Sequence, residues 1–380
     1  MFEFVNEASE PIKSDLMTVN MGPQHPATHG VLRVEIQTDS EVVARATPHI
    51  GYLHRCMEKH CEHLDYRGVI PFTDRLDYLA AMNMEWTYVL AVEKMLKTEV
   101  PIRAEYVRVI IGELQRIASH LMFFGTYAID LGAFTPFLYA FQDRENILRI
   151  FEEVSGARLL YNYIWVGGVW NDLTDDHLVR IENFLETFEE SIKKYHKLVG
   201  ENQIFISRTA HVGVISKDQV YDYGLTGPVL RGSGIDWDLR KNRPYSIYDK
   251  FEFDVIKGEG LKGQLGDCWD RYYVRMMEMH ESIKIIRQAL AGIEAGPVMG
   301  KVPKIIKPAK GEVYMRTECP RGELGIHLVS DGTKVPYRLK VKSSCFTHVS
   351  ALGEMAPGML IADLVASIGS IDIVLGEVDR

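Results

Sequence analysis

The hydrophobic pattern of the 380-residue chain changes period twice, and this constrains the fold more than any other feature. Residues 16–48 and 311–342 alternate apolar and polar side chains, as strands with one buried face do. Between them, residues 49–310 mostly follow the spacing of amphipathic helices. The sequence therefore predicts an α+β fold, in which a central helical bundle is flanked by small antiparallel sheets, with no internal repeat.

The same pattern divides the chain into four segments. We expect an N-terminal arm used in assembly, an N-terminal β-sheet, a helical bundle, and C-terminal β-hairpins with a helix packed on the bundle. These segments are, in order, residues 1–15, 16–48, 49–310 and 311–380.

Local signals predict where several helices begin and end. Thr73 is expected to cap a helix that holds Asp74 in its first turn, and Pro101 to begin the next helix. Thr174 precedes two aspartates at the start of a helix that ends near Gly200. Acidic residues there stabilise the positive end of the helix dipole, and glycine is typical of a helix stop.

One apolar run, residues 121–142, has the length of a membrane span and carries a single charge, Asp130. We do not interpret it as a span, because Asp130 lies near its middle and Gly132 and Pro136 interrupt it. The run also continues an amphipathic helix with polar positions. We expect a buried core helix, a turn, and a second helix from about Pro136, so that any membrane association comes through partner subunits.

Composition limits the classes of partner. The formal net charge is -9, which gives no overall attraction for nucleic acid or anionic lipid. The five cysteines are an odd number spread through a large chain without a signal peptide. This favours a reducing compartment over a disulfide framework. We therefore expect a cytoplasmic protein that does not bind nucleic acid.

The segment joining the first two predicted strands is unusual. Residues 22–30 contain two glycines and two prolines, which stiffen a loop, and they carry His25 and His29. A loop built in this way presents side chains and does not pack a core. The alternative is that His29 is an ordinary solvated loop histidine.

Several motifs recur in the order and spacing of one known family. They are GPQHPATHGVLR, PHIGYLHR, DRLDYL, AIDLGAFTPF, LRGSGIDWDLRK, RGELG, LVSDG and the terminal GEVDR. Together they cover nearly the whole chain. In them the sequence resembles the quinone-binding 49 kDa subunit family of respiratory complex I, the proton-pumping NADH:quinone oxidoreductase.

The resemblance implies a fold like that of nickel-iron hydrogenase large subunits and a catalytic role in quinone reduction. Carried over to this sequence, His29 and Tyr78 bind and protonate the quinone headgroup, and His25, on the same loop, also binds the quinone. Asp130 neighbours His29, and Arg55 lies beside the terminal iron-sulfur cluster of a partner subunit. That cluster supplies the electrons, so the resemblance implies no metal, flavin or other redox cofactor in this chain.

Quinone reduction by two electrons also needs two protons, and His and Tyr suit their delivery. Tyrosine is protonated at neutral pH, whereas histidine is mostly neutral unless a carboxylate favours the imidazolium. Asp130 is the carboxylate that we expect beside His29. The alternative for Asp130 is a cap at the end of its helix, before Gly132. The alternative for Tyr78 is a core tyrosine.

The family also implies partners and a location. We expect the terminal-cluster iron-sulfur subunit, small peripheral-arm subunits and the quinone-tunnel membrane subunit of complex I. These partners would hold the chain as a peripheral protein at the cytoplasmic face of the inner membrane. The sequence leaves open the electron donor (NADH, ferredoxin or another), the subunit complement and the quinone type, ubiquinone or menaquinone.

Two rival interpretations involve metals. A hydrogenase-like site needs cysteine thiolates, yet the sequence contains no C-x-x-C pair. A zinc-stabilised scaffold is the second, because Cys56, His60 and His63 fall on one face of a predicted helix. We expect this stripe to be metal-free, since a single helix rarely supplies four ligands.

Three departures from the family pattern stand out. Leu160 occupies a position where many relatives have histidine, and Trp165 one where they have arginine. The connection over residues 301–311 is shorter than the family's, which usually includes a helix. We therefore expect this chain to lack the contacts that those ionisable groups and that helix make in the family.

Overall fold

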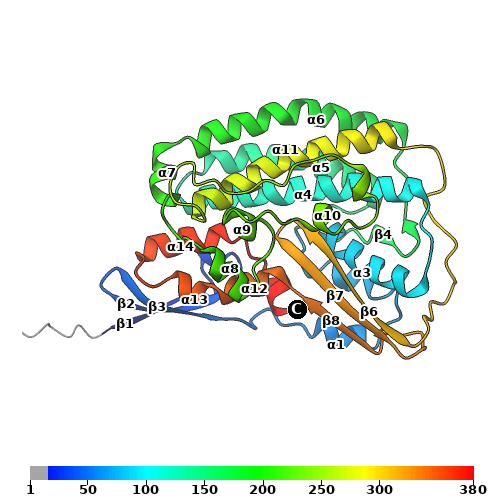
Figure 1. The fold of residues 1–380 in the computed structure, drawn as a ribbon, viewed down its shortest axis with the longest axis horizontal. Coiled ribbons are helices and arrows are strands. Elements are labelled where there is room, and N and C mark those ends of the chain that lie inside the picture. Colours follow the sequence, from blue (N-terminus) through cyan, green and yellow to red (C-terminus); the bar gives the residue numbers. More distant parts are fainter. Residues whose placement is uncertain (1–15) are drawn as a thin grey trace, which may run out of the picture.

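Long helices lie above two small sheets in the computed structural model, which describes residues 16–380. Figure 1 shows most of the long helices across the top of the molecule and the two three-stranded sheets below them. The predicted N-terminal arm, residues 1–15, lies outside the described residues. The predicted α+β architecture is confirmed.

The N-terminal sheet has three antiparallel strands in the order β1-β2-β3. They are β1 (Met17–Met21), β2 (Arg33–Asp39) and β3 (Val42–His49). The alternation in the sequence reflects one buried face of this sheet. Val34 and Ile36 are fully buried, while their neighbours in β2 are partly exposed. The loop between β1 and β2 contains η1 (Pro26–Thr28), and this loop carries the two histidines.

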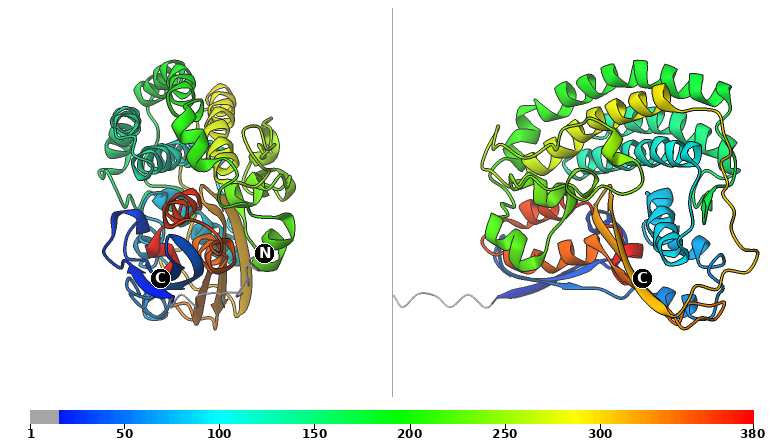
Figure 2. Two further views of the ribbon diagram at one scale, coloured as in Figure 1. Left: turned by 90° about the vertical axis from the view of Figure 1, so that its left-hand side faces the viewer. Right: turned by 45° about the vertical axis from the view of Figure 1, so that its right-hand side comes forward.

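Five long helices form the bundle: α3 (Ala81–Leu96), α4 (Ile102–Asp130), α5 (Thr135–Ser155), α6 (Asp175–Tyr195) and α11 (Cys268–Gly292). Figure 2 looks along four of them and shows α4, α5, α6 and α11 packed side by side. Local chemistry explains their ends. Pro101 precedes α4, and the Thr174 side chain closes a capping box at the start of α6.

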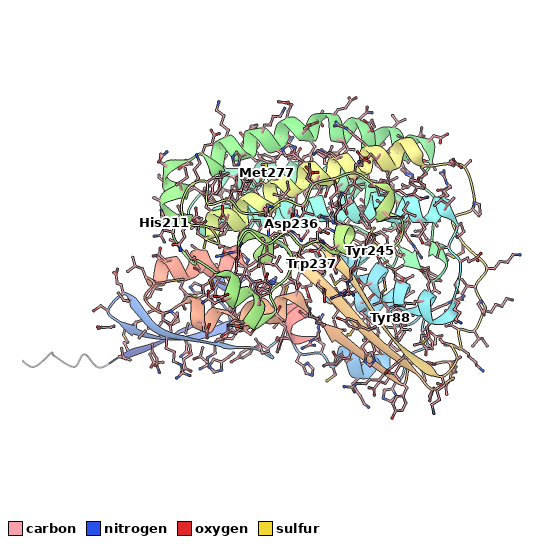
Figure 3. All side chains as sticks on the ribbon, viewed as in Figure 1. Tyr88, His211, Asp236, Trp237, Tyr245 and Met277 are labelled. Atoms are coloured by element: carbon pink, nitrogen blue, oxygen red, sulfur yellow. The ribbon has the colours of Figure 1, made fainter. Side chains whose placement is uncertain are left out.

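Shorter elements connect the long helices. They are α1 (Met57–Cys61), α2 (Ile70–Thr73), β4 (Ile164–Trp165), β5 (Gly168–Val169), the π-helical turn η2 (His196–Gly200), α7 (Gln203–Thr209), α8 (Lys217–Tyr223), α9 (Gly227–Gly232), α10 (Leu239–Asn242) and η3 (Tyr248–Lys250). Figure 3 shows Tyr245, which precedes η3, beside the sheet and α10; its ring meets the edge of Trp86 at a centroid distance of 5.6 Å.

The C-terminal part contributes the second sheet and four helices. The antiparallel strands are β6 (Gly311–Cys319), β7 (Gly322–Ser330) and β8 (Arg338–Lys342). The helices are α12 (Ser344–Ser350), α13 (Leu352–Met355), α14 (Ile361–Ser370) and α15 (Leu375–Asp379). Helix α14 packs against the end of α4, which brings the C-terminal segment to the N-terminal loop.

Two expectations about the helices have different outcomes. The apolar run over residues 121–142 is divided between α4 and α5, as predicted, and Asp130 is the last residue of α4. No helix within residues 16–380 combines the length and apolar character that crossing a bilayer requires.

The prediction for Thr73 is wrong: Thr73 ends α2 instead of starting a helix, because its hydroxyl donates to the carbonyl of Ile70 at 2.6 Å.

Candidate quinone-type cavity

A cavity of about 380 Å³ opens where the N-terminal loop, α4 and the segment after α14 meet. Its walls come from the loop after η1, the turn before α3, one face of α4 and residues 372–374. The lining residues are Pro26, His29, Gly30, Tyr78, Leu79, Met122, Thr126, Ile129, Asp130, Arg321, Asp372, Ile373 and Val374. Most of this wall is apolar, and a few polar groups converge on it, as in typical small-molecule sites.

His29 and Asp130 meet at one side of the cavity. His29 ends η1 in the left-handed conformation (φ 51°), and its Nε2 lies 2.6 Å from Oδ2 of Asp130. Only 12% of the His29 side chain and 9% of the Asp130 side chain are exposed. This short, largely buried contact with the carboxylate fixes the orientation of the imidazole ring in the cavity wall.

A close approach of helices positions the Asp130 carboxylate. Gly369 of α14 faces Asp130, and a Cβ atom at this position would lie 2.9 Å from Asp130 Oδ2. The same atom would lie 2.8 Å from the Tyr127 ring. Glycine therefore lets α14 pack directly on the end of α4 and leaves room for the carboxylate beside His29.

Tyr78 occupies another part of the cavity wall. Burial, reinforced by the neighbouring Asp77 carboxylate, raises the pKa of the Tyr78 phenol, and the charges of Arg321 and Arg55 only partly oppose this. The phenol is consequently a neutral hydrogen-bond donor throughout the physiological pH range. The same largely apolar cavity is therefore lined by a phenol and an imidazole, and both groups can donate hydrogen bonds.

At the base of the cavity lies a buried ion cluster that the sequence did not predict. Arg321 Nη1 donates to Asp77 Oδ2 at 2.6 Å and to Ser119 Oγ at 3.0 Å, and its Nη2 donates to Asp372 Oδ1 at 3.1 Å. Arg321 is 1% exposed. The RGELG and DRLDYL motifs contain two of these residues, but charge in a sequence does not reveal burial.

The remaining predicted site residues lie outside the cavity wall. The exposed His25 accepts the amide of Ala27 on Nδ1 at 3.2 Å and so caps η1. Arg55 is also exposed, and its Nη2 donates to the Arg75 carbonyl at 2.6 Å and to the Gly376 carbonyl at 3.3 Å. Arg55 is close enough for its charge to act on Tyr78.

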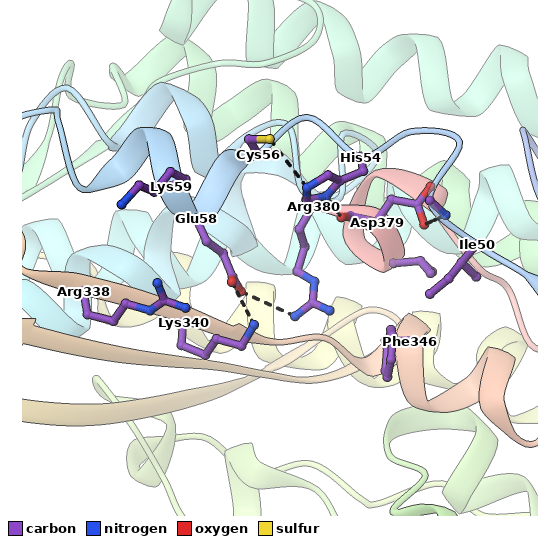
Figure 4. Close-up of a pocket in the computed structure, with 12 residues that line it drawn as sticks. Ile50, His54, Cys56, Glu58, Lys59, Arg338, Lys340, Phe346, Asp379 and Arg380 are labelled. Atoms are coloured by element: carbon purple, nitrogen blue, oxygen red, sulfur yellow. Dashed lines mark hydrogen bonds and ion pairs between the residues drawn. The ribbon is translucent and has the colours of Figure 1, made fainter.

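A second cavity, of about 360 Å³, is lined by Cys56, one of the three residues of the stripe that we expect to be metal-free (Figure 4). Cys56 precedes α1 in the left-handed conformation (φ 55°), and its Sγ lies 3.6 Å from Nε2 of His54. His60, by contrast, packs on the ring of Phe72 at 5.9 Å. Within residues 16–380, no three histidine, cysteine or acidic side chains gather as a metal site would require.

The chain is similar to known proteins along most of its length. Residues 130–380 match the family model described as respiratory-chain NADH dehydrogenase, 49 Kd subunit. Proteins named as the D subunit of NADH-quinone oxidoreductase from Chlorobaculum tepidum, Chlorobium phaeobacteroides and Prosthecochloris aestuarii are each 53% identical over 373 residues. In each case the alignment covers 97% of this chain and 93% of the relative.

Proposed function

Because the chain belongs to the 49 kDa subunit family of respiratory-chain NADH dehydrogenases, we propose that it is the quinone-binding catalytic subunit of an NADH-quinone oxidoreductase. The proposed binding site is the cavity between His29 and Tyr78. Relatives that are named as a subunit of this oxidoreductase support membership of the complex.

The observation that carries the site assignment is the 2.6 Å contact of His29 with Asp130 in the wall that also holds Tyr78. A quinone headgroup is a flat, largely apolar ring with a carbonyl oxygen at each end. It needs an apolar slot and two hydrogen-bond donors, and the cavity offers both.

Reduction consumes two electrons and two protons: quinone + 2e⁻ + 2H⁺ gives quinol. In the proposed reaction, His29 donates one proton from its imidazolium to one carbonyl oxygen, and Tyr78 donates the other. Asp130, 2.6 Å from His29 Nε2, holds the imidazole ring in place during the transfer. After it, His29 and Tyr78 each recover one proton from solvent, so both donors are ready for the next turnover.

The electrons come from outside this chain in the proposed scheme. A partner subunit carries the terminal iron-sulfur cluster, and Arg55 is the residue proposed to lie beside it. Arg55 is exposed, and its guanidinium bonds the carbonyl of Arg75, three residues before Tyr78. In the proposed scheme, the positive charge of Arg55 lies between the partner's cluster and the quinone site.

We also propose that a membrane subunit holds the chain at the cytoplasmic face of the inner membrane. The end of α4 and the start of α5, close to the cavity, present exposed apolar side chains. They are Ile129, Phe134, Leu138 and Tyr139. A quinone with an apolar tail would enter from this side.

A photoreactive quinone analogue tests the site directly. On illumination of the assembled complex, peptides of this chain that contain Met122, Thr126 or Leu79 should carry the label, and excess unlabelled quinone should compete with it. Label confined to other surfaces of the chain, or to other subunits alone, would overturn the assignment of this cavity.

A further inference from the structure

Two carboxyl groups, Asp74 and Glu85, lie against each other behind the turn that carries Tyr78. Asp74 follows α2, Glu85 is on α3, and both residues are 0% exposed. Both carboxyl groups accept amides from the same stretch of backbone, residues 162–164. One oxygen of each group, Asp74 Oδ1 and Glu85 Oε1, is buried and has no hydrogen-bond partner within residues 16–380.

The two groups clamp one strained segment of backbone. The amide of Asn162 donates to Asp74 Oδ2 at 3.0 Å, and the amides of Tyr163 and Ile164 donate to Glu85 Oε2 at 2.9 and 2.6 Å. In this segment Leu160 (φ 58°) and Asn162 (φ 46°) are left-handed although neither is glycine. Such residues persist only where surrounding contacts hold them.

No ion pair neutralises these carboxyl groups within residues 16–380. The contrast with Glu93, further along α3, is informative: Glu93 is also buried and also accepts a backbone amide, from Gly167 at 2.7 Å. Glu93, however, is paired with the Arg108 guanidinium at 2.6 Å. Glu93 can stay ionised, whereas two unpaired anions in contact at the Asp74 and Glu85 positions would repel each other strongly.

The other charged or titratable groups around the pair do not neutralise either carboxyl group. Arg75, next in the chain to Asp74, is exposed. The charge of Arg144 on α5 acts on Tyr161, and its guanidinium makes no ion pair with either carboxyl. Tyr161 and Tyr163 face the pair from the clamped segment, and burial raises the pKa of both phenols, so they remain neutral.

We propose that Asp74 and Glu85 share a single proton between Oδ1 and Oε1, and that this proton positions the turn that carries Tyr78. The positioning part rests on the proposed quinone site; the sharing does not. Tyr78 is four residues from Asp74, and the carbonyl of Leu79 accepts the Gln115 side chain at 2.7 Å. The turn is thus held at its start by the carboxyl pair and at its end by α4.

Loss of the shared proton to solvent would leave two adjacent carboxylates and push them apart. Burial raises the pKa of Asp74 to about 6, and burial together with Asp74 holds the pKa of Glu85 well above its ordinary value. Raised carboxyl pKa values give stability that is fully present at acidic pH and is lost as pH rises through the raised values. The clamp should therefore weaken on the alkaline side, and Tyr78 should lose its position there.

The test compares the assembled complex with its Glu85→Gln and Asp74→Asn variants, with Glu93→Gln as control. An amide replaces the shared proton by a fixed N–H donor of the same size, so both test variants should fold. In the wild type, the unfolding temperature should fall and the KM for quinone should rise with pH, the latter by up to about tenfold per unit, with kcat less affected. In the test variants both slopes should be clearly shallower, because the contribution of the pair is removed while Asp77, whose pKa burial raises to about 6, still titrates. Glu93→Gln should lower stability and keep the wild-type slopes.

The remaining outcomes would each contradict part of the proposal. An alkaline fall of the unfolding temperature in Glu85→Gln as steep as in the wild type would overturn the shared proton, and so would failure of both amide variants to assemble. A KM slope as steep as that of the wild type in both variants, while the unfolding slope becomes shallower, would overturn the link to Tyr78. The unfolding readout does not depend on quinone chemistry, so it separates failure of this proposal from failure of the proposed function.

Discussion

His29 Nε2 lies 2.6 Å from Asp130 Oδ2, although 101 residues separate the two in the chain. The contact joins the loop of the N-terminal sheet to the last residue of the longest helix, α4. The carboxylate therefore fixes the position of the imidazole ring in a largely apolar cavity. Changes to Asp130 should be seen in the rate of quinone reduction.

Asp130→Asn should preserve the fold, because the two side chains are nearly isosteric, and should lower quinone reductase activity at neutral pH. Without the carboxylate, the His29 ring loses a charged hydrogen-bond partner at 2.6 Å and is held less firmly in the cavity. We expect a loss of about tenfold, which corresponds to about 1.4 kcal/mol for one charge-assisted hydrogen bond. Steady-state rates of the assembled complex measure it.

Asp143→Asn is a matched control for that experiment, because Asp143 bonds Tyr195 on α6, outside the cavity. Its rate of quinone reduction should match that of the wild type. An Asp130→Asn rate that also matches the wild type would mean that Asp130 acts only as a structural group at the end of α4.

Arg321→Met should destabilise the chain strongly, since it leaves Asp77 and Asp372 buried without their common partner. Breaking a buried ion pair from one side typically costs about 3–5 kcal/mol. The loss should shrink at low pH, where the two carboxyl groups can take up protons. Thermal unfolding at several pH values checks both statements.

Arg338→Met provides the comparison, because Arg338 is about half exposed and pairs with Glu62 at 2.8 Å on the surface. This change should cost less than about 1 kcal/mol. Equal losses for the Arg321 and Arg338 variants would contradict the role given to the buried cluster.

Cys56→Gly should leave assembly intact and keep or slightly raise the unfolding temperature. Cys56 has φ 55°, a conformation that glycine adopts without strain. The gain should be about 1 kcal/mol or less. Zinc analysis of the purified chain completes the test, because stoichiometric zinc that disappears on this substitution would revive the metal-binding interpretation of Cys56, His60 and His63.

The sequence predicted the strands and long helices well because their signals are local. The alternation around Val34 and Ile36 reflects a buried sheet face, and Thr174 carries a cap motif that the structure contains. Thr73 misled the prediction, since a hydroxyl can cap the helix that follows or bond back to the helix before it. Tertiary packing decided between these, with Asp74 drawn inside to meet Glu85.

The site was only partly predictable for a related reason. Periodicity cannot bring His29, Tyr78 and Asp130 together, because their contacts cross many elements, and only the family resemblance suggested the set. The Arg321 cluster and the Asp74–Glu85 pair escaped prediction. A charged residue in a sequence looks the same whether it is solvated or buried, and only the packed structure distinguishes these cases.

The central claim is that Tyr78 and His29 donate to a quinone in the cavity that they line. The most direct measurement is steady-state quinone reduction by the assembled complex with Tyr78→Phe, beside electron delivery to the partner's cluster and the exposed control Tyr221→Phe. Tyr78→Phe removes one donor and nothing else, so the rate should fall about ten- to a thousand-fold while assembly, cluster reduction and the control stay normal. Near wild-type quinone reduction by Tyr78→Phe, and likewise by His29→Ala, would contradict the account.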